Sequence, residues 1–220
     1  MKDKPEAAEA DSIFIMDTVN NAVSYSRISD RWSRVRDPAP VNKCVADLEK
    51  MLKRNSYVLD AGCGTGTPID VFLSAMGHRI AGIDISERMI EIAESKGIKN
   101  AEYTVCDFLE YAPTVRFDAV IAFDSLFHIP PARQRSIYAH AARLLKEEGY
   151  FLFTHGKTHG HTEGVMFGEP FSYASLDAGE TEELLLQNGF DIIEFTRDYE
   201  EATTGTRDLL VLARKRKSQT

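Results

Sequence analysis

The pattern of apolar and polar positions predicts strands that alternate with helices along most of the chain. A short apolar run at 58–59 leads into a glycine-rich turn, and apolar residues then recur at helical spacing, at Ile69, Phe72, Leu73 and Met76. Further apolar runs predict strands at 80–84, 101–105, 117–123, 150–154, 190–195 and 207–213. This alternation is typical of an α/β fold built on a parallel sheet.

Helical periodicity fills the segments between these strands. We expect helices at 12–36, 44–52, from about 68, and at 86–97, 131–146 and 180–187. Ser86 is suited to cap the start of its helix, and Gly97 to end it. The polar residues 1–11 are expected to be disordered, and 155–164 is interpreted as a long irregular stretch.

The glycine-rich turn carries the first functional signal. Gly62, Gly64 and Gly66 allow positive φ and a close approach of a ligand, and the free N–H groups of the following helix can hold an anion. A dinucleotide-binding fingerprint has Gly or Ala at its sixth position, where this chain has Thr67. The next strand ends in Asp84, whose carboxylate can accept hydrogen bonds from both ribose hydroxyls of an adenosine.

Four motifs in register resemble those of the class I S-adenosylmethionine (SAM)-dependent methyltransferases. They are residues 59–66, 82–86, 106–108 and 117–120, and the resemblance covers about 25–214. It is most similar to the small-molecule methyltransferase branch. The resemblance implies one domain over 1–220 with a Rossmann-like, seven-stranded, mostly parallel sheet, an antiparallel C-terminal edge strand and helices on both faces.

The resemblance also implies a cofactor, SAM, with S-adenosylhomocysteine as its product. Asp107 is expected to accept from the adenine amino group, and Met89 either contacts the adenine or is a core residue. Cys63 and Cys106 are interpreted as packing residues rather than nucleophiles. The implied cofactor-binding residues are Asp60, Ala61, Gly62, Cys63, Gly64, Gly66, Asp84, Ile85, Met89, Cys106, Asp107, Phe108, Phe123, Asp124, Tyr25 and Trp32.

The N-terminal segment 12–54 is predicted to form helices that cover the cofactor. Residues 25–32 resemble that covering element, so Tyr25 and Trp32 either contact the cofactor or pack their helix on the sheet. Three arginines could reach the cofactor's carboxylate, with at least two of them expected in solvent: Arg31, Arg34 and Arg36.

The end of the fourth strand is where the family places the reacting methyl group. Asp124 is expected at the cofactor's amino end, Phe127 as a substrate wall, and His128 as either a base or a loop hydrogen-bond partner. Nucleic-acid amino-methyltransferases have an acid or Asn followed directly by Pro-Pro-Tyr/Phe here. In this chain Ser125 and Leu126 follow Asp124, which argues against base methylation.

Residues 155–173 are interpreted as a substrate lid, because a long loop after the fifth strand is more often functional than filler. The alternative is a surface loop whose aromatic residues pack on the following helix. The candidate catalytic residues are His128, Asp124 and His155, with Tyr173 as a further possible base. The candidate substrate-binding residues are Phe127, His128, His155 and Tyr173.

A metal site is not expected. His155, His159 and His161 have no standard ligand spacing, and no Asp-Asn pair follows the fifth strand. We therefore predict a metal-independent reaction.

Bulk properties narrow the partners. A length of 220 residues with 43% hydrophobic content suits one soluble domain, and a net charge of −8 argues against a large nucleic-acid surface. Three cysteines without metal-like spacing favour a reducing, cytoplasmic setting, and no stretch approaches the length of a membrane span. We expect a monomer or a homodimer acting on a small molecule.

The predicted reaction is direct, in-line transfer of a methyl group from SAM to a small-molecule acceptor. The acceptor atom is left open among O, N, S and C, and a base is needed only if the nucleophile arrives protonated. Two other classes stay open: an NAD-dependent oxidoreductase and a non-catalytic SAM-binding module.

Overall fold

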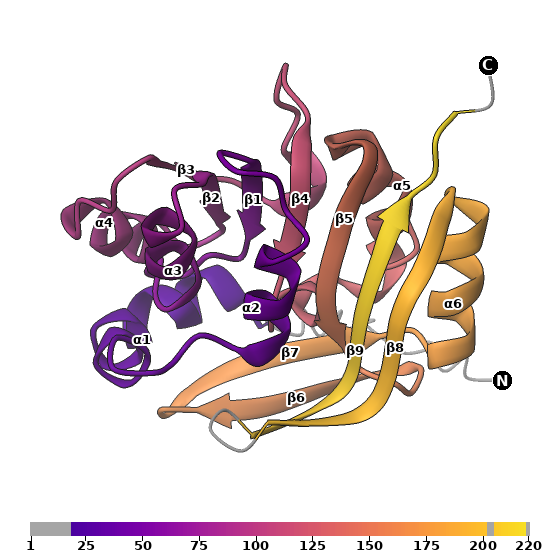
Figure 1. Cartoon of the computed structure of the whole chain (residues 1–220). Helices are drawn as coiled ribbons and strands as arrows, with labels where there is room; N and C mark the ends of the chain where they lie inside the picture. Colours follow the sequence, from indigo (N-terminus) through magenta and orange to yellow (C-terminus); the bar gives the residue numbers. More distant parts are fainter. Residues whose placement is uncertain (1–18, 202–204, 219–220) are drawn as a thin grey trace, which may run out of the picture.

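The computed structural model describes residues 19–201 and 205–218. Its main sheet has seven strands in the order β3-β2-β1-β4-β5-β9-β8 (Figure 1). The strands are β1 (Tyr57–Ala61), β2 (Arg79–Asp84), β3 (Ala101–Val105), β4 (Phe117–Ala122), β5 (Leu145–His155), β8 (Phe190–Glu201) and β9 (Gly205–Lys215). Strands β1 to β5 are mutually parallel, whereas β9 is antiparallel to both β5 and β8. The predicted antiparallel pair therefore closes the C-terminal edge of the sheet.

Helices cover both faces of the sheet. They are α1 (Asn21–Arg36), α2 (Lys43–Glu49), α3 (Ile69–Ala75), α4 (Glu87–Ser95), α5 (Ser136–Leu144) and α6 (Ala178–Gln187). Alternate residues of β1 point to opposite faces, so Leu59 belongs to a core with α5 and α6, and Val58 to a second core with α2 and α3. The predicted Rossmann-like α/β class is confirmed. None of the helices in the described part of the chain is both long and apolar enough to cross a membrane.

Several predicted boundaries shift. Helix α1 begins at Asn21, because the side chain of Asn20 caps it by accepting from the N–H groups of Ala22 and Val23. The predictions for residues 1–18 lie outside the described residues. The predicted helix at 131–146 is divided into a 3₁₀ turn, η3 (Pro131–Arg133), and α5, and β5 already begins at Leu145. Two further 3₁₀ turns are η1 (Phe108–Glu110) and η2 (Leu126–His128).

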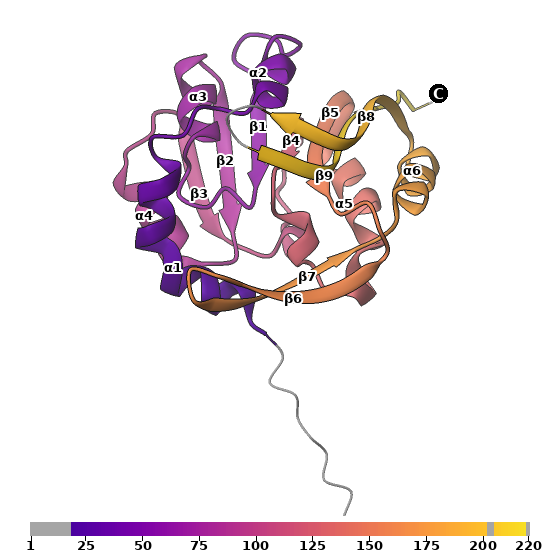
Figure 2. The same ribbon diagram turned by 90° about the horizontal axis from the view of Figure 1, so that it is seen from below.

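The prediction of an irregular loop after β5 is wrong. Residues Gly160–Met166 (β6) and Glu169–Ser175 (β7) form an antiparallel hairpin that makes its own two-stranded sheet. Its turn residues, Phe167 and Gly168, both have positive φ, as tight hairpin turns that match strand twist require. The hairpin and α1 lie side by side across the end of the sheet where β1, β2 and β4 stop (Figures 1 and 2).

Helix α1 contacts strand β7 and the hairpin turn at several points. The contacts recur at helical spacing on α1: Asn21 Nδ2 to Ser172 O (2.9 Å), Ser24 Oγ to Pro170 O (2.6 Å), Arg27 to Glu169 (3.0 Å), and the Arg31 guanidinium 4.5 Å from the Phe167 ring centroid. The helix and the hairpin therefore form one composite cover over the carboxyl ends of the parallel strands.

Candidate active site

The glycine-rich turn is fixed between the ends of β1, β2 and β4. Gly62 has φ +83°, and a Cβ placed there would lie 2.3 Å from the Cβ of Ser125. The Ser125 hydroxyl in turn donates to the carbonyl of Ala61 at 2.6 Å. A side chain at Gly62 would force the ends of β1 and β4 apart, so this position needs glycine for both its backbone angle and its close packing.

Asp84 links the end of β2 to the glycine turn. Its Oδ2 accepts from the N–H of Gly64 and its Oδ1 from the N–H of Ser86, both at 2.9 Å. Burial raises the pKa of this carboxyl to about 6, although the two N–H groups lower it. The carboxylate is therefore oriented toward the cavity, with lone pairs left for further donors.

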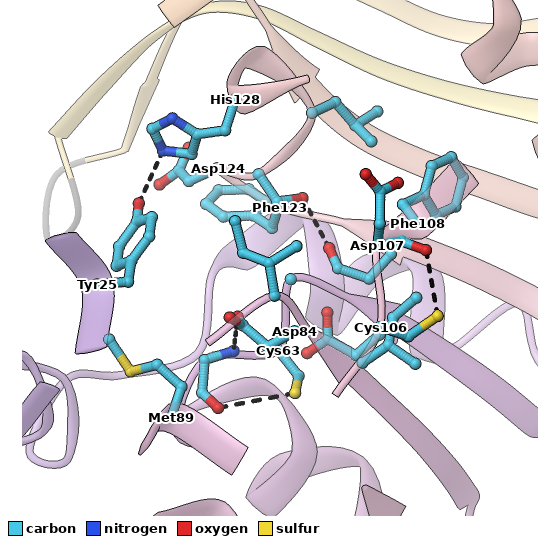
Figure 3. A pocket seen from close by; sticks show the side chains of 18 of the residues that line it. Tyr25, Cys63, Asp84, Met89, Cys106, Asp107, Phe108, Phe123, Asp124 and His128 are labelled. Atoms are coloured by element: carbon cyan, nitrogen blue, oxygen red, sulfur yellow. Dashed lines mark hydrogen bonds between the residues drawn. The ribbon is translucent and has the colours of Figure 1, made fainter. Parts of the chain in front are cut away.

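The structure brings the predicted cofactor residues together around one cavity (Figure 3). All of them line it except Gly66, where a Cβ would instead meet Tyr103 Oη at 2.7 Å. The cavity is also lined by Arg36, one of the three arginines that could reach the cofactor's carboxylate. Its other lining residues were not predicted as cofactor ligands: Thr67, Ile69, Ile83, Ser125, Leu126, His128, Ile129 and Pro130.

Arg36 is the arginine of α1 that reaches this cavity. Its guanidinium lies 5.7 Å from the centroid of the Trp32 ring, and burial lowers its pKa. Arg34 is exposed, and Arg31 stacks over Phe167 on the hairpin. The last turn of α1 thus places a positive charge beside the carboxylates of the cavity.

Asp107 already has partners at the far end of the cavity. Its Oδ1 caps η1 by accepting from the N–H of Leu109 at 2.7 Å, and its Oδ2 forms an ion pair with Arg133 at 3.0 Å. The carboxylate stays partly exposed in the cavity lining, so a hydrogen bond to an adenine amino group would add to these contacts.

Asp60 lies at the cavity's polar side, behind the glycine turn. It is buried close to Asp70 of α3, and burial raises the pKa of both carboxyls. The charge of Asp84 raises the pKa of Asp60 further. Because like charges in a dry site disfavour full ionisation, this pair holds a proton more tightly than free aspartates do.

A second cavity of about 620 Å³ lies between the sheet and the hairpin. Its lining includes the predicted substrate residues Phe127, His128, His155 and Tyr173. The rings of Phe127 and Tyr173 are 5.7 Å apart and form one wall. The volume lies within the range of small-molecule sites.

The two cavities meet at four residues. Tyr25, Trp32, Asp124 and His128 line both of them. The rings of Tyr25 and Trp32 are packed edge to face with centroids 6.0 Å apart, and Tyr25 is packed similarly on His128 at 5.3 Å. We refer to these four residues as the junction.

His128 is held from three directions at the junction. Its Nε2 lies 2.8 Å from Tyr25 Oη, and its Nδ1 lies 2.9 Å from the carbonyl of Ser172 and 3.0 Å from Asn21 Nδ2. Burial lowers the pKa of His128 to about 4. The imidazole is therefore neutral near pH 7, and one of its two nitrogens is an unprotonated hydrogen-bond acceptor.

His155 lines the second cavity but is occupied by protein groups. Its Nε2 lies 2.8 Å from Gln134 Oε1, its Nδ1 lies 3.2 Å from the carbonyl of Gly156, and burial lowers its pKa to about 4. The amide of Gln134 donates to the carbonyls of Leu126, Ile129 and Ala174. This geometry favours a positioning role, in which His155 orients the amide that ties the hairpin to η2.

Sequence reasoning missed Arg207 of β9. Its Nε donates to Oδ1 and Oδ2 of Asp124, at 2.7 and 2.9 Å, and its guanidinium lies 5.1 Å from the Phe123 ring centroid. Only long-range pairing of β9 with β5 brings it to the junction, so no local pattern could have indicated it. Within 19–201 and 205–218, no group of three or more His, Cys, Asp or Glu is arranged to hold a metal ion.

Comparisons with known proteins identify the family. Residues 58–149 match the sequence model of a protein family whose description is "Methyltransferase domain". The O-methyltransferase rstn1 of Aspergillus nomiae is 30% identical over 155 residues, which are 65% of this chain and 68% of that protein. The Burkholderia thailandensis 1,6-didemethyltoxoflavin-N1-methyltransferase, solved with 1,6-didemethyltoxoflavin and S-adenosylhomocysteine, has a TM-score of 0.64 and 25% identity, covering 89% of this chain and 85% of that one.

The chain belongs to the class I SAM-dependent methyltransferases. Not every relative is matched over its full length. A relative in Geobacillus sp. (strain WCH70) is 29% identical over 143 residues, which are 60% of this chain and 57% of that protein. The chain thus spans little more than half the length of that relative.

Proposed function

We propose that this protein binds SAM in the first cavity and transfers its methyl group to a small molecule in the second. The observation that carries the proposal is the junction. Tyr25, Trp32, Asp124 and His128 line both cavities, so two ligands bound there would meet at these four residues. Holding two reactants in contact and in line can supply most of the rate of a displacement reaction.

The residues of the first cavity fit SAM. Asp84 presents a carboxylate to the two ribose hydroxyls, and Arg36 presents a guanidinium to the carboxylate of the methionine part. When bound, SAM supplies an electrophilic methyl carbon on a positively charged sulfur. The charge of Asp124 favours a positive charge at this end of the cavity, which favours SAM over an anionic cofactor.

The reaction needs little from the protein beyond alignment. The proposed transfer is a direct, in-line displacement that is independent of metal ions. A proton acceptor is required only for a protonated nucleophile, and His128 and Asp124 lie at the junction for that purpose. We place the acceptor between the composite cover and the sheet, with Phe127 and Tyr173 as walls.

The names of similar proteins support a small-molecule acceptor. One is an O-methyltransferase, and another is an N1-methyltransferase solved with its 1,6-didemethyltoxoflavin. A cytoplasmic location, a monomeric or dimeric state and the absence of nucleic-acid substrates stay predictions from the sequence.

Calorimetry and a labelled-methyl assay test the proposal together. We expect the protein to bind SAM and S-adenosylhomocysteine but not NAD, and to transfer label from SAM to at least one member of a small-molecule pool. Tight binding of NAD without a response to SAM would support the oxidoreductase alternative. Binding of SAM with no transfer to any pool would support a non-catalytic SAM-binding module.

A further inference from the structure

We propose that Tyr25 is a catalytic residue that relays the acceptor's proton to His128, and that the acceptor is a neutral phenol. This inference rests on the proposed methyl transfer at the junction. It adds the chemical class of the acceptor and the path that its proton takes.

The Tyr25 hydroxyl is held at a fixed place in the junction. Its Oη lies 2.8 Å from His128 Nε2, and a dashed line marks this hydrogen bond in Figure 3. Its neighbours on α1 are anchored on both sides: Ser24 Oγ donates to the Pro170 carbonyl at 2.6 Å, and Ser26 Oγ lies 2.9 Å from Ser86 Oγ. Because Tyr25 also lines both cavities, its oxygen can contact an acceptor that lies beside the reacting methyl group.

The surroundings of His128 decide which nitrogen carries its hydrogen. Nδ1 and Asn21 Nδ2 each lie 2.9 Å from the Ser172 carbonyl. With hydrogen on Nδ1, both groups donate to the two lone pairs of that carbonyl. With hydrogen on Nε2 instead, Nδ1 would accept from Asn21 Nδ2 at 3.0 Å, but its lone pair would also face the Ser172 carbonyl oxygen at 2.9 Å, which is repulsive. The Nδ1–H tautomer therefore leaves Nε2 to accept the hydrogen of Tyr25.

The protonation states suit a relay. Burial raises the pKa of Tyr25, as do the charges of Asp84 and Asp124, and only the charge of Arg36 opposes this. Burial lowers the pKa of His128 to about 4, against the opposing effects of the Ser172 carbonyl and Asp124. Near neutral pH, Tyr25 thus holds a proton that it donates to an unprotonated His128, and its oxygen keeps lone pairs for the acceptor's hydrogen.

The second cavity has both aromatic and polar lining residues. The rings of Phe127 and Tyr173 form an aromatic wall that continues through His128, whose ring centroid is 5.0 Å from that of Tyr173. Several of the other lining residues are polar. Besides histidines, the side chains of the described lining residues that carry a charge are Asp124, Asp208 and Arg207.

This lining favours a flat and uncharged acceptor. Arg207 is paired with Asp124 at 2.7 Å, so its charge is already compensated within the protein, and a carboxylate acceptor would face the like charges of Asp124 and Asp208. The aromatic wall suits a planar ring. A phenol combines a planar ring with a hydroxyl whose proton is acidic enough for a weak base such as His128 to receive during the reaction.

The proposed step is balanced as follows. The acceptor oxygen forms a bond to the methyl carbon as the methyl–sulfur bond breaks, and that electron pair stays on sulfur. The acceptor's proton moves to Tyr25 Oη while the proton of Tyr25 moves to His128 Nε2. The products are a methyl ether, S-adenosylhomocysteine and an imidazolium that hydrogen-bonds the Ser172 carbonyl, and the imidazolium then loses its proton to water.

A series of para-substituted phenols tests the relay with wild type and Tyr25→Phe. For weakly acidic phenols, which need proton removal, we expect kcat to fall about a hundredfold in Tyr25→Phe. For nitrophenols ionised at the assay pH, we expect a change of less than about threefold, because no proton is left to relay. A loss of the same size across the series would show a structural role and overturn the relay. Tyr173→Phe is the matched control, with an expected effect that does not vary with phenol acidity.

A second readout does not depend on turnover. In ¹⁵N spectra of the labelled protein, His128 should show hydrogen on Nδ1 and a bare Nε2 from about pH 5 to 8. Hydrogen on Nε2 would overturn the relay. Calorimetry of Tyr25→Phe with S-adenosylhomocysteine should give an affinity within about threefold of wild type, because the hydroxyl is assigned to the acceptor.

The outcome also separates this inference from the proposed function. Transfer of label to amines or thiols but to no phenol would overturn the relay and leave the methyltransferase proposal standing. Absence of SAM binding and of transfer to any pool would overturn both.

Discussion

The Nε of Arg207 donates to both carboxylate oxygens of Asp124, at 2.7 and 2.9 Å, across 83 residues of sequence. Asp124 lies two residues after the end of β4 and has a φ of +56°. Thr154 on β5 holds it by accepting from its N–H at 2.8 Å and donating to its Oδ1 at 3.0 Å. The antiparallel strand β9 therefore helps to fix an acid that lines both cavities.

Replacing Arg207 should change both stability and the titration of His128. Arg207→Gln removes a charge-assisted N–H that both oxygens of Asp124 share, from a pair that is mostly buried, so we expect the free energy of unfolding to fall by about 1–3 kcal/mol. The uncompensated charge of Asp124 should raise the pKa of His128 above its present value of about 4. Denaturant unfolding and an NMR titration measure the two effects. Arg214→Gln, an exposed change on the same strand, should produce neither.

Arg36 should recognise the carboxylate of the cofactor. We expect Arg36→Gln to weaken binding of S-adenosylhomocysteine about tenfold, since a charge-assisted contact is replaced by a neutral one. Binding of adenosine, which lacks the carboxylate, should be unchanged in the same calorimetric experiment. Arg34→Gln, exposed on the same helix turn, is the control. An equal loss of affinity for S-adenosylhomocysteine and adenosine would mean that Arg36 supports the folded cavity and does not bind the carboxylate.

Asp84 should make SAM binding depend on pH. Its pKa is about 6, so affinity should be constant above that pH and fall below it, as protonation removes an acceptor for the ribose hydroxyls. Folding stability should respond in the opposite sense. Because the pKa of Asp84 is higher in the folded state, the folded protein binds this proton more tightly than the unfolded chain does. The contribution of Asp84 to the free energy of unfolding therefore decreases as pH rises from about 4 to about 6.

The variant Asp84→Asn isolates this group. It should bind SAM at least tenfold more weakly at pH 8, which is about 1.4 kcal/mol, and should lose the pH dependence that Asp84 causes. Glu94→Ala, which alters an exposed acid on α4, should bind like wild type. An unchanged affinity in Asp84→Asn would mean that the ribose lies elsewhere.

Asn21 should hold the composite cover together. Its amide donates to the Ser172 carbonyl and accepts from the Ser172 N–H, both at 2.9 Å, and it is 8% exposed. Asn21→Ala leaves these β7 groups without that partner, so we expect a loss of about 1–3 kcal/mol in unfolding free energy. Hydrogen exchange at the Ser172 amide should accelerate. Val23→Ala, at a more exposed position on α1, is the control and should change neither strongly.

Local signals explain why much of the first cavity could be predicted. The glycine turn, the acid at the end of β2 and the Ser86 cap each lie within a few residues of the element that they define. The strand order then brings these ends together, because parallel strands finish at the same edge of the sheet. One cavity is therefore lined by Asp60 to Gly64, Asp84 and Asp107, although Asp60 and Asp107 are 47 residues apart in the sequence.

The parts that were missed depend on long-range pairing or on unusual backbone angles. The hairpin contains Gly160, Gly164 and Gly168, and a sequence rich in glycine is typical of a loop. Its turn also places Phe167 at a positive φ that few non-glycine residues adopt. It also contacts α1, which lies about 150 residues earlier in the chain, so no local pattern contains these contacts. Arg207 reaches Asp124 only through the β5–β9 ladder, so no local pattern contains it.

The meeting of cofactor and acceptor at the junction is tested most directly by a crystal structure of the protein with S-adenosylhomocysteine and a phenol. We predict that the sulfur lies beside Tyr25, Trp32, Asp124 and His128, with the phenol oxygen facing it and in contact with Tyr25 Oη. A sulfur that points away from the second cavity, or a phenol bound at another surface, would contradict the account.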